Sequence, residues 1–287
     1  MLPPWVPTRS NRAIRRAVKT ILAIVEEIIR DRRAEIASGA TGTKDLLALL
    51  LEAQQSGVQI SDELIRDEAT TFLLGGHETT AIALAWVWHL LAQHPDVEER
   101  LAKHLEVELC GRPPRFEDLP RLTYLQQVLR ESLRLYPPAW YMTRRADRDV
   151  EIGGYRVPKG VTVVMDIWAV HHDSRFYPDP EEFRPERWTE EFTKGLDKFA
   201  YIPFGVGARR CIGALFAEAE AMLAIASIVQ RFQIRAVSNA GVTPIAATTL
   251  RPGEGGVKVM VRARASRQDS TVPSPRKSGW YRAFVAA

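Results

Sequence analysis

The stretch Phe204-Gly205-Val206-Gly207-Ala208-Arg209-Arg210-Cys211-Ile212-Gly213 places one cysteine behind two arginines, among three glycines and directly before an apolar helical run. A cysteine at the start of a helix meets free backbone N–H groups and the positive end of the helix dipole, so its thiolate is favoured. The adjacent arginines add to this effect, and the glycines allow close approach to a flat ligand. The stretch predicts a thiolate that ligates iron in a planar cofactor, with Phe204 shielding the sulfur from water.

The alternative for Cys211 is an inert buried cysteine beside a glycine turn, which is the usual case for a cysteine without such neighbours. The ten residues, however, resemble the haem-ligand loop of the cytochrome P-450 family of haem-thiolate monooxygenases. The resemblance implies that Cys211 is the axial iron ligand of haem b (iron protoporphyrin IX) and that Arg209 holds a haem propionate. It also implies that three further residues of the loop contact the cofactor, namely Phe204, Gly205 and Gly213.

A long helix is predicted from the capping residues Ser61-Asp62-Glu63 to Gln93. Its middle, Gly75-Gly76-His77-Glu78-Thr79-Thr80, contains four poor helix formers and predicts a local distortion that opens a groove. The carboxylate of Glu78 and the hydroxyl of Thr79 can pass protons. The helix is therefore expected to carry an acid and an alcohol at one place.

This motif resembles the family's distal helix, which implies that Gly76 lies against the distal haem face. By the same resemblance Thr79 hydrogen-bonds the iron-bound oxygen, and Glu78 connects the site to solvent protons. Gly75 stands where the family often has alanine, a departure that loosens the helix but preserves the acid and the alcohol.

A zinc site is excluded by spacing. His77-Glu78 begins a metalloprotease pattern, but Ala81 occupies the position of its second histidine. The pairs His171-His172 and His89 with His94 lack supporting ligands, so we expect them to be surface or capping residues.

Glu131 and Arg134 stand three positions apart on one predicted helix face, which on most helices gives an exposed ion pair. The leucines and valines around them predict instead that the pair is buried and needs a further partner. Arg187 is the candidate, since it lies in Phe183-Arg184-Pro185-Glu186-Arg187-Trp188, which resembles the family's meander motif. The resemblance implies a buried triad that supports the cysteine loop.

The same resemblance assigns the residues that follow Pro137-Pro138. Arg144, at the family's position for an arginine after the proline pair, is expected to contact a haem propionate. Three large side chains, together with the turn at Ala247-Thr248, are expected to line the substrate cavity: Trp140, Tyr141 and Met142.

The chain's 287 residues are 46% hydrophobic and 26% charged, which is ordinary for a globular protein. The net charge of +4 comes from a Ser/Pro/Arg-rich tail without a nucleic-acid-binding motif, so nucleic-acid binding is excluded. Residues 263–287 are expected to be disordered. Two distant cysteines, Cys110 and Cys211, favour a reducing compartment, and neither a signal peptide nor a membrane span is recognised, so a cytoplasmic protein is expected.

Helical periodicity predicts further helices at residues 11–36, 46–53, 96–109 and 122–135, and one from the cysteine loop to about residue 232. Short β-branched runs broken by turn residues predict antiparallel strands within residues 150–170, 243–250 and 256–262. Residues 173–203 are expected to be irregular. The resemblance implies one haem domain over residues 1–262, mainly α with small antiparallel sheets, which is the cytochrome P-450 fold lacking its N-terminal helices.

The resemblance covers about Pro3 to Arg262 and implies a monooxygenase that uses dioxygen at thiolate-ligated haem iron to insert one oxygen atom into a lipophilic substrate. The electrons must come from a separate ferredoxin or flavoprotein reductase, because Arg210 stands where a dinucleotide fingerprint needs glycine. Two alternatives stay open: a truncated haem-binding remnant without turnover of its own, and a peroxide-driven haem enzyme.

Overall fold

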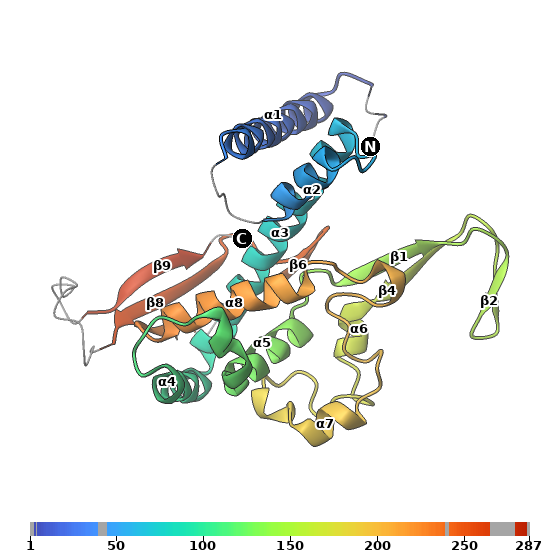
Figure 1. Ribbon diagram of the computed structural model, residues 1–287. Coiled ribbons are helices and arrows are strands. Elements are labelled where there is room, and N and C mark those ends of the chain that lie inside the picture. The colour runs from blue at the N-terminus through green and yellow to red at the C-terminus, as the bar shows by residue number, and fades with distance from the viewer. Residues whose placement is uncertain (1–2, 4, 40–44, 239–240, 265–278, 286–287) are drawn as a thin grey trace. The chain divides into compact units, whose positions relative to one another are not determined.

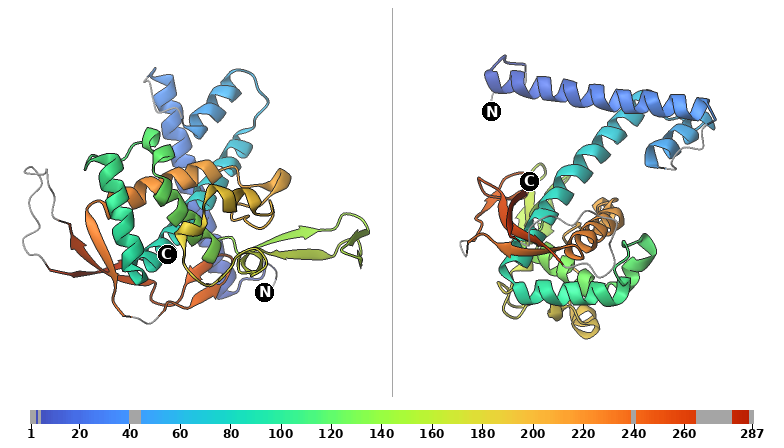
Figure 2. Two further views of the ribbon diagram at one scale, coloured as in Figure 1. Left: turned by 90° about the horizontal axis from the view of Figure 1, so that it is seen from below. Right: turned by 90° about the vertical axis from the view of Figure 1, so that its left-hand side faces the viewer.

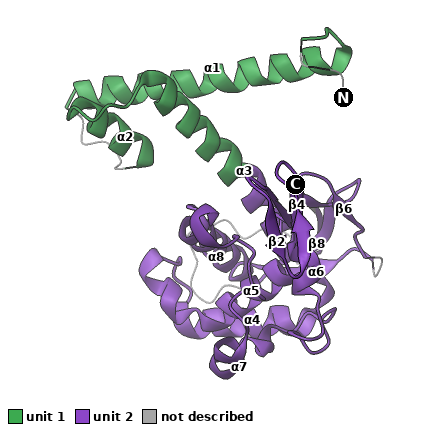
Figure 3. Cartoon of the chain, turned by 90° about the vertical axis from the view of Figure 1, so that its right-hand side faces the viewer, with its two compact units in different colours: residues 1–77 green, residues 78–287 purple. Residues whose placement is uncertain are grey.

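The computed structural model describes the chain except for residues 1–2, 4, 40–44, 239–240, 265–278 and 286–287 (Figure 1). The described residues form two compact units, residues 1–77 and residues 78–287 (Figure 3). Helices dominate both units, and the described strands are short, antiparallel and confined to the second unit. The fold class predicted from the sequence, mainly α with small antiparallel sheets, is confirmed.

The first unit consists of two helices and the start of a third. Helix α1 spans Arg9–Ala37, and helix α2, which contacts it, spans Leu46–Gln55. The carboxylate of Asp45 accepts a hydrogen bond of 2.9 Å from the Ala48 amide and so caps α2. The same carboxylate pairs with Arg32 of α1 at 2.6 Å. One side chain therefore fixes both the start of α2 and its attachment to α1.

Helix α3 (Asp62–Gln93) has the limits predicted from the sequence. Its start is capped by Ser61, whose hydroxyl accepts a hydrogen bond of 3.1 Å from the Leu64 amide. The α-helix continues without a break through Gly75 and Gly76, so the predicted distortion is not seen in the helix. Each glycine costs about 1 kcal/mol relative to alanine, which is too little to interrupt a helix of 32 residues.

The core of the second unit lies among the later turns of α3 and three other long helices. The helices after α3 are α4 (Pro95–Leu109), α5 (Thr123–Leu135), α6 (Ile167–His171), α7 (Glu190–Gly195) and α8 (Ala214–Val229). The 3-10 turns between them are η1 (Phe116–Arg121), η2 (Pro185–Arg187) and η3 (Gly207–Arg209). Side chains from α3, α4, α5 and α8 meet in one apolar cluster that includes Leu91, Leu101, Leu125, Val128 and Ile225.

The strands in the described part of the second unit form four antiparallel sheets. Three are pairs, of β1 (Tyr141–Arg145) with β4 (Thr162–Asp166), β2 (Val150–Ile152) with β3 (Tyr155–Val157), and β6 (Pro244–Ala246) with β7 (Leu250–Pro252). In the fourth, β8 (Val257–Ala263) lies between β5 (Phe232–Ala236) and β9 (Tyr281–Val285). Strands β1 and β4 run side by side as a ribbon that carries the β2–β3 hairpin at its far end (Figures 1 and 2).

Several sequence predictions are wrong in detail. Strand β1 precedes the predicted sheet, and residues 167–170 form helix α6 because Asp166 caps it through a 2.9 Å bond from the Ala169 amide. The helix after the cysteine loop ends at Val229, and β5 follows it. In the tail expected to be disordered, residues 281–285 form β9, since this short run of β-favouring residues finds a partner in β8. Residues 265–278 of the tail lie outside the described residues.

None of the helices in the described part of the chain combines the length and the apolar composition that a bilayer crossing requires.

Candidate functional site

The cysteine loop joins the irregular segment after α7 to helix α8. Cys211 is exposed, so the alternative of an inert buried cysteine does not describe it. Its backbone amide donates a hydrogen bond of 2.8 Å to the carbonyl of Phe204, which closes the loop on itself. Gly213 is the N-cap of α8, whose first residue is Ala214. The thiol therefore lies just outside the N-terminus of α8 and faces solvent.

Two glycines give the loop its shape. Gly205 and Gly207 have φ values of 70° and 72°, in the left-handed region that residues with a Cβ rarely adopt. A Cβ at Gly205 would also lie 2.9 Å from Sδ of Met142, which comes from β1. The sulfur of Met142, a residue predicted to line the substrate cavity, lies beside Gly205 of the cysteine loop. Since side chains alternate along a strand, Arg144 lies on the same face of β1 as Met142.

We expect Gly205→Ala to lower the free energy of unfolding by about 1–2 kcal/mol, because alanine must then adopt a left-handed conformation. The contact with Met142 adds little, since a flexible side chain can move away. Urea unfolding of the protein without cofactor measures the change. Gly241→Ala is the matched control, because φ there lies outside the left-handed region and an added Cβ would meet nothing within 4 Å. Equal stability of the two variants would contradict this explanation.

Glu78, the predicted acid of the long helix, is paired with a residue that sequence reasoning missed. The hydroxyl of Thr249 donates a hydrogen bond of 2.9 Å to Oε1 of Glu78. Thr249 is buried and lies in the turn between β6 and β7, whereas Glu78 is exposed. The indole of Trp140 reaches the same turn and donates to the carbonyl of Ala247 at 2.9 Å. The structure thus brings the acid and one predicted substrate-lining side chain to a single turn.

The other predicted residues of these motifs belong to α3 and β1. Gly76 belongs to the first unit, and Thr79 is half-buried on α3. The ring of Tyr141 packs on that of Trp140, with 4.6 Å between centroids. Arg144 is exposed, and its guanidinium donates to the carbonyl of Thr143 at 2.8 Å. The Arg144 side chain therefore stands at the surface of the β1–β4 ribbon.

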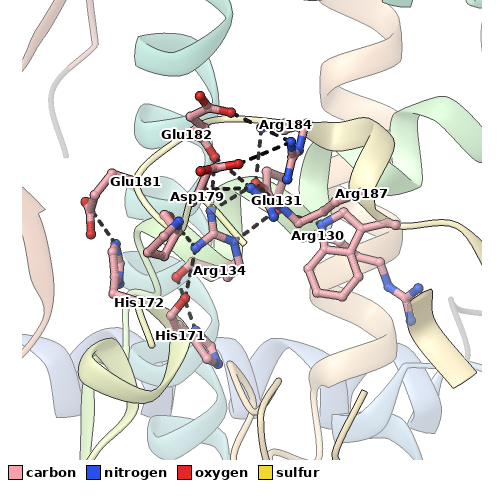
Figure 4. Close-up of polar contacts among 12 residues, drawn as sticks. Arg130, Glu131, Arg134, His171, His172, Asp179, Glu181, Glu182, Arg184 and Arg187 are labelled. Atoms are coloured by element: carbon pink, nitrogen blue, oxygen red, sulfur yellow. Dashed lines mark hydrogen bonds and ion pairs between the residues drawn. The ribbon is translucent and has the colours of Figure 1, made fainter. Parts of the chain in front are cut away.

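Glu131, Arg134 and Arg187 meet in the interior of the second unit (Figure 4). Both oxygens of Glu131 accept from Arg134, at 3.0 Å from Nε and 2.9 Å from Nη2. Nε of Arg187 donates to Oε1 at 2.8 Å. The indole of Trp188 and the amide of Arg184 complete the set, at 2.8 and 3.1 Å. No sequence pattern predicted that the Trp188 indole and the Arg184 amide would join the group.

The remaining guanidinium donors of the triad bind main-chain oxygens of the last residue of α6 and of the irregular segment that follows it. Arg134 donates to the carbonyls of His171, Pro180 and Glu182. Arg187 donates to those of Pro178, Asp179 and Glu182. A buried ion pair is tolerated only where its charged groups also make hydrogen bonds, and the carboxylate and both guanidinium groups of the triad do so. The triad therefore holds in place a segment that has no strand ladder of its own.

His171 is not the surface or capping residue that was expected, because its side chain is completely buried. Its Nε2 accepts a hydrogen bond of 2.9 Å from the Ile202 amide, so Nδ1 carries the proton and donates to the Arg134 carbonyl at 3.2 Å. The Tyr201 ring stacks on it. Burial, with smaller effects of the Arg134 and His172 charges, lowers the pKa of His171 to about 3. Its ring is therefore neutral in the folded protein.

We expect the protein to lose stability as the pH falls from about 6.5 towards 3, since His171 then takes up a proton in the unfolded state only. As the pH falls from 7 to 5, protonation of His171 in the unfolded state lowers the free energy of unfolding by up to about 2 kcal/mol. Urea unfolding at both pH values measures the change. His171→Gln has no imidazole and should show a smaller pH dependence. An unchanged pH dependence in that variant would assign the effect to other groups.

Comparison with known proteins identifies the family. The sequence profile of the cytochrome P-450 family matches residues 1–259. The chain belongs to the cytochrome P-450 family. Members of this family are haem-thiolate monooxygenases, so the resemblance drawn from the cysteine loop is confirmed.

Individual cytochromes P-450 match over most of this chain. Cyclooctat-9-en-7-ol 5-monooxygenase of Streptomyces melanosporofaciens is 43% identical over 234 residues, which are 81% of this chain and 50% of that protein. Pentalenene oxygenase of Streptomyces avermitilis is 37% identical over 246 residues, 85% of this chain and 54% of that protein. The crystal structure of a cytochrome P-450, CYP102L1, superposes with a TM-score of 0.80 at 32% identity, covering 91% of this chain and 59% of that one. The chain spans about half the length of the curated relatives it matches.

The residues around Cys211 fit the haem that cytochromes P-450 carry. A thiolate sulfur is a soft anionic ligand for haem iron, and exposed Arg209 offers charge to a propionate. Three neighbouring apolar side chains are 74–84% exposed and offer surface to a large apolar ligand: Ile212, Leu215 and Phe216. The thiol ligand, the positive charge of Arg209 and the apolar surface all fit a haem group.

Proposed function

We propose that this chain is the haem-binding portion of a monooxygenase that inserts one oxygen atom from dioxygen into a lipophilic organic substrate. The observation that carries the proposal is the exposed thiol of Cys211, presented by a loop with two left-handed glycines in a member of the cytochrome P-450 family. A structural cysteine would not need either exposure or such a loop.

The residues proposed to hold haem b come from the cysteine loop and from β1. Cys211 would ligate the iron, and Arg209 and Arg144 would pair with the propionates. Phe204, Gly205 and Gly213 would form the surface beneath the ring. When bound, the haem supplies the activation of dioxygen, which no side chain can perform. The chain would contribute the iron ligand and the orientation of the ring.

Proton supply is proposed to involve Glu78 together with Thr79 on α3, with Gly76 lying nearby along the helix. The Thr249 hydroxyl donates to Oε1 of Glu78 and so orients the carboxylate. Because Glu78 is exposed, it can exchange protons with water at its other oxygen. A single hydrogen bond thus leaves the acid both oriented and in contact with solvent.

Membership of the family supports a class of substrate and a kind of electron donor for this chain. The names of two relatives refer to an alkene and an alkenol, pentalenene and cyclooctat-9-en-7-ol, which supports a lipophilic substrate for this chain. The electron donor would be a separate ferredoxin or flavoprotein reductase. The two cysteines, distant in the sequence, favour a reducing compartment and support a cytoplasmic location.

The test is to purify the chain, titrate it with haem, record the difference spectrum of its reduced carbon-monoxide complex, and assay turnover with an added electron donor. A thiolate-type spectrum with turnover supports the proposal. Glu78→Gln should then keep its haem and lose about 100-fold in turnover. Haem binding without turnover would favour the remnant that binds haem alone, and turnover with peroxide in the absence of an electron donor would favour the peroxide-driven enzyme. Failure to bind haem would overturn the proposal.

A further inference from the structure

His171 joins two segments that are far apart in the sequence. It is the last residue of α6 and is completely buried. Its carbonyl accepts a bond of 2.8 Å from Nη1 of Arg134, and its Nδ1 lies 3.2 Å from the Arg134 carbonyl. On the other side of the ring, Nε2 accepts from the Ile202 amide at 2.9 Å. One imidazole thus connects α5, which carries Glu131 and Arg134, to the segment that leads into the cysteine loop (Figure 4 shows the α5 side).

From Ile202 the connection continues through main-chain bonds to the thiol-bearing residue. The Ile202 carbonyl accepts from the Gly205 amide at 2.9 Å, and the Phe204 carbonyl accepts from the Cys211 amide at 2.8 Å. No flexible side chain intervenes after His171. A displacement of Ile202 would therefore move the backbone that holds Cys211.

The ring suits this position because it is an acceptor on one side and a donor on the other. Its stacking on Tyr201, with 5.5 Å between centroids, fixes the ring plane, and the Tyr201 hydroxyl donates to the Arg130 carbonyl at 3.2 Å. The Ile202 amide belongs to a half-buried residue and faces the buried His171 ring. Removing the acceptor of an amide that is shielded from water costs more than an average hydrogen bond contributes. Burial keeps the imidazole neutral, so Nε2 remains an acceptor.

We propose that His171 is a positioning residue that fixes the start of the cysteine loop through the Ile202 amide and thereby sets the position of the Cys211 thiolate. The first part of the inference, the link from His171 to Ile202, stands by itself. The second part, the effect on the thiolate as an iron ligand, rests on the proposed function.

The first part is tested by amide hydrogen exchange of the chain without haem. His171→Leu removes the acceptor, and the Ile202 amide should then exchange about tenfold faster. His171→Gln can place an oxygen near the position of Nε2 and should restore most of the protection. His172→Gln is the matched control, since His172 bonds the Trp168 carbonyl and its replacement should leave the exchange of the Ile202 amide unchanged.

If His171→Leu does not fold, His171→Phe retains a ring that can stack on Tyr201 and also removes the acceptor. If the Ile202 amide is as protected in His171→Leu or His171→Phe as in the original chain, the inference is overturned.

The second part is tested on the haem-loaded chain by the reduced carbon-monoxide spectrum, normalised to haem content. A lower thiolate-ligated fraction in His171→Leu, restored by His171→Gln, is expected. Faster exchange at Ile202 with an unchanged spectrum would overturn the role in positioning the thiolate. If the original chain binds no haem, the proposed function fails, while the exchange measurement still decides whether His171 holds the loop.

Discussion

Glu131→Ala is expected to lower the free energy of unfolding by about 3–5 kcal/mol, because it leaves Arg134 and Arg187 buried without their carboxylate. Most domains are stable by only about 5–15 kcal/mol, so this loss would remove much of the folding free energy. The carboxylate also binds the Trp188 indole and the Arg184 amide, and both would lose an acceptor. Urea unfolding and haem content per chain are the two measurements. We expect haem incorporation to be lost as well.

The control for Glu131 is Glu190→Ala. Glu190 also pairs with a residue of its own helix, Lys194 at 2.5 Å, but its side chain is 82% exposed. Exposed ion pairs contribute little to folding stability, so Glu190→Ala should change the free energy of unfolding by less than about 1 kcal/mol. Glu131→Gln keeps an accepting oxygen without the charge and should lie between the two. A Glu131→Ala protein with the original stability and ordinary haem content would refute the supporting role of the triad.

Cys211→Ala is expected to abolish the thiolate-type spectrum of the haem-loaded chain, since the proposed axial ligand is lost. Cys110 provides a matched control because it is the other free cysteine, and it is also exposed. It occupies the left-handed C-cap of α4 and makes a contact of 3.5 Å with the Val107 carbonyl, with no other role in the described structure. Cys110→Ala should keep both haem and spectrum. An unchanged spectrum in Cys211→Ala would remove the basis of the proposed function.

Sequence reasoning succeeded where the signal is local. The limits of α3 follow from a capping serine and an apolar run, and the contact of Glu131 with Arg134 follows from their spacing on an apolar helix. The cysteine loop carries its own glycines, so its exposed thiol could be expected from ten residues. In each case the residues that determine the structure lie within a few turns of one another.

The misses share a different cause. His171 resembles a surface histidine because its partners, Arg134 and Ile202, are more than 30 positions away in the sequence. The Thr249 bond to Glu78 spans 171 positions. Met142 could not be assigned to the cysteine loop from β1 alone, since only the folded chain brings it to Gly205. Local patterns predict elements, whereas these contacts depend on how the elements pack.

The two triad arginines bind residues 178–182 only through main-chain oxygens. Every amino acid presents the same carbonyl, so replacing a side chain in this segment leaves those contacts available. Inserting or deleting one residue is different, because it shifts the whole row of carbonyls past the guanidinium groups. Evolution in this part of the chain should therefore tolerate changes of identity far more readily than changes of length.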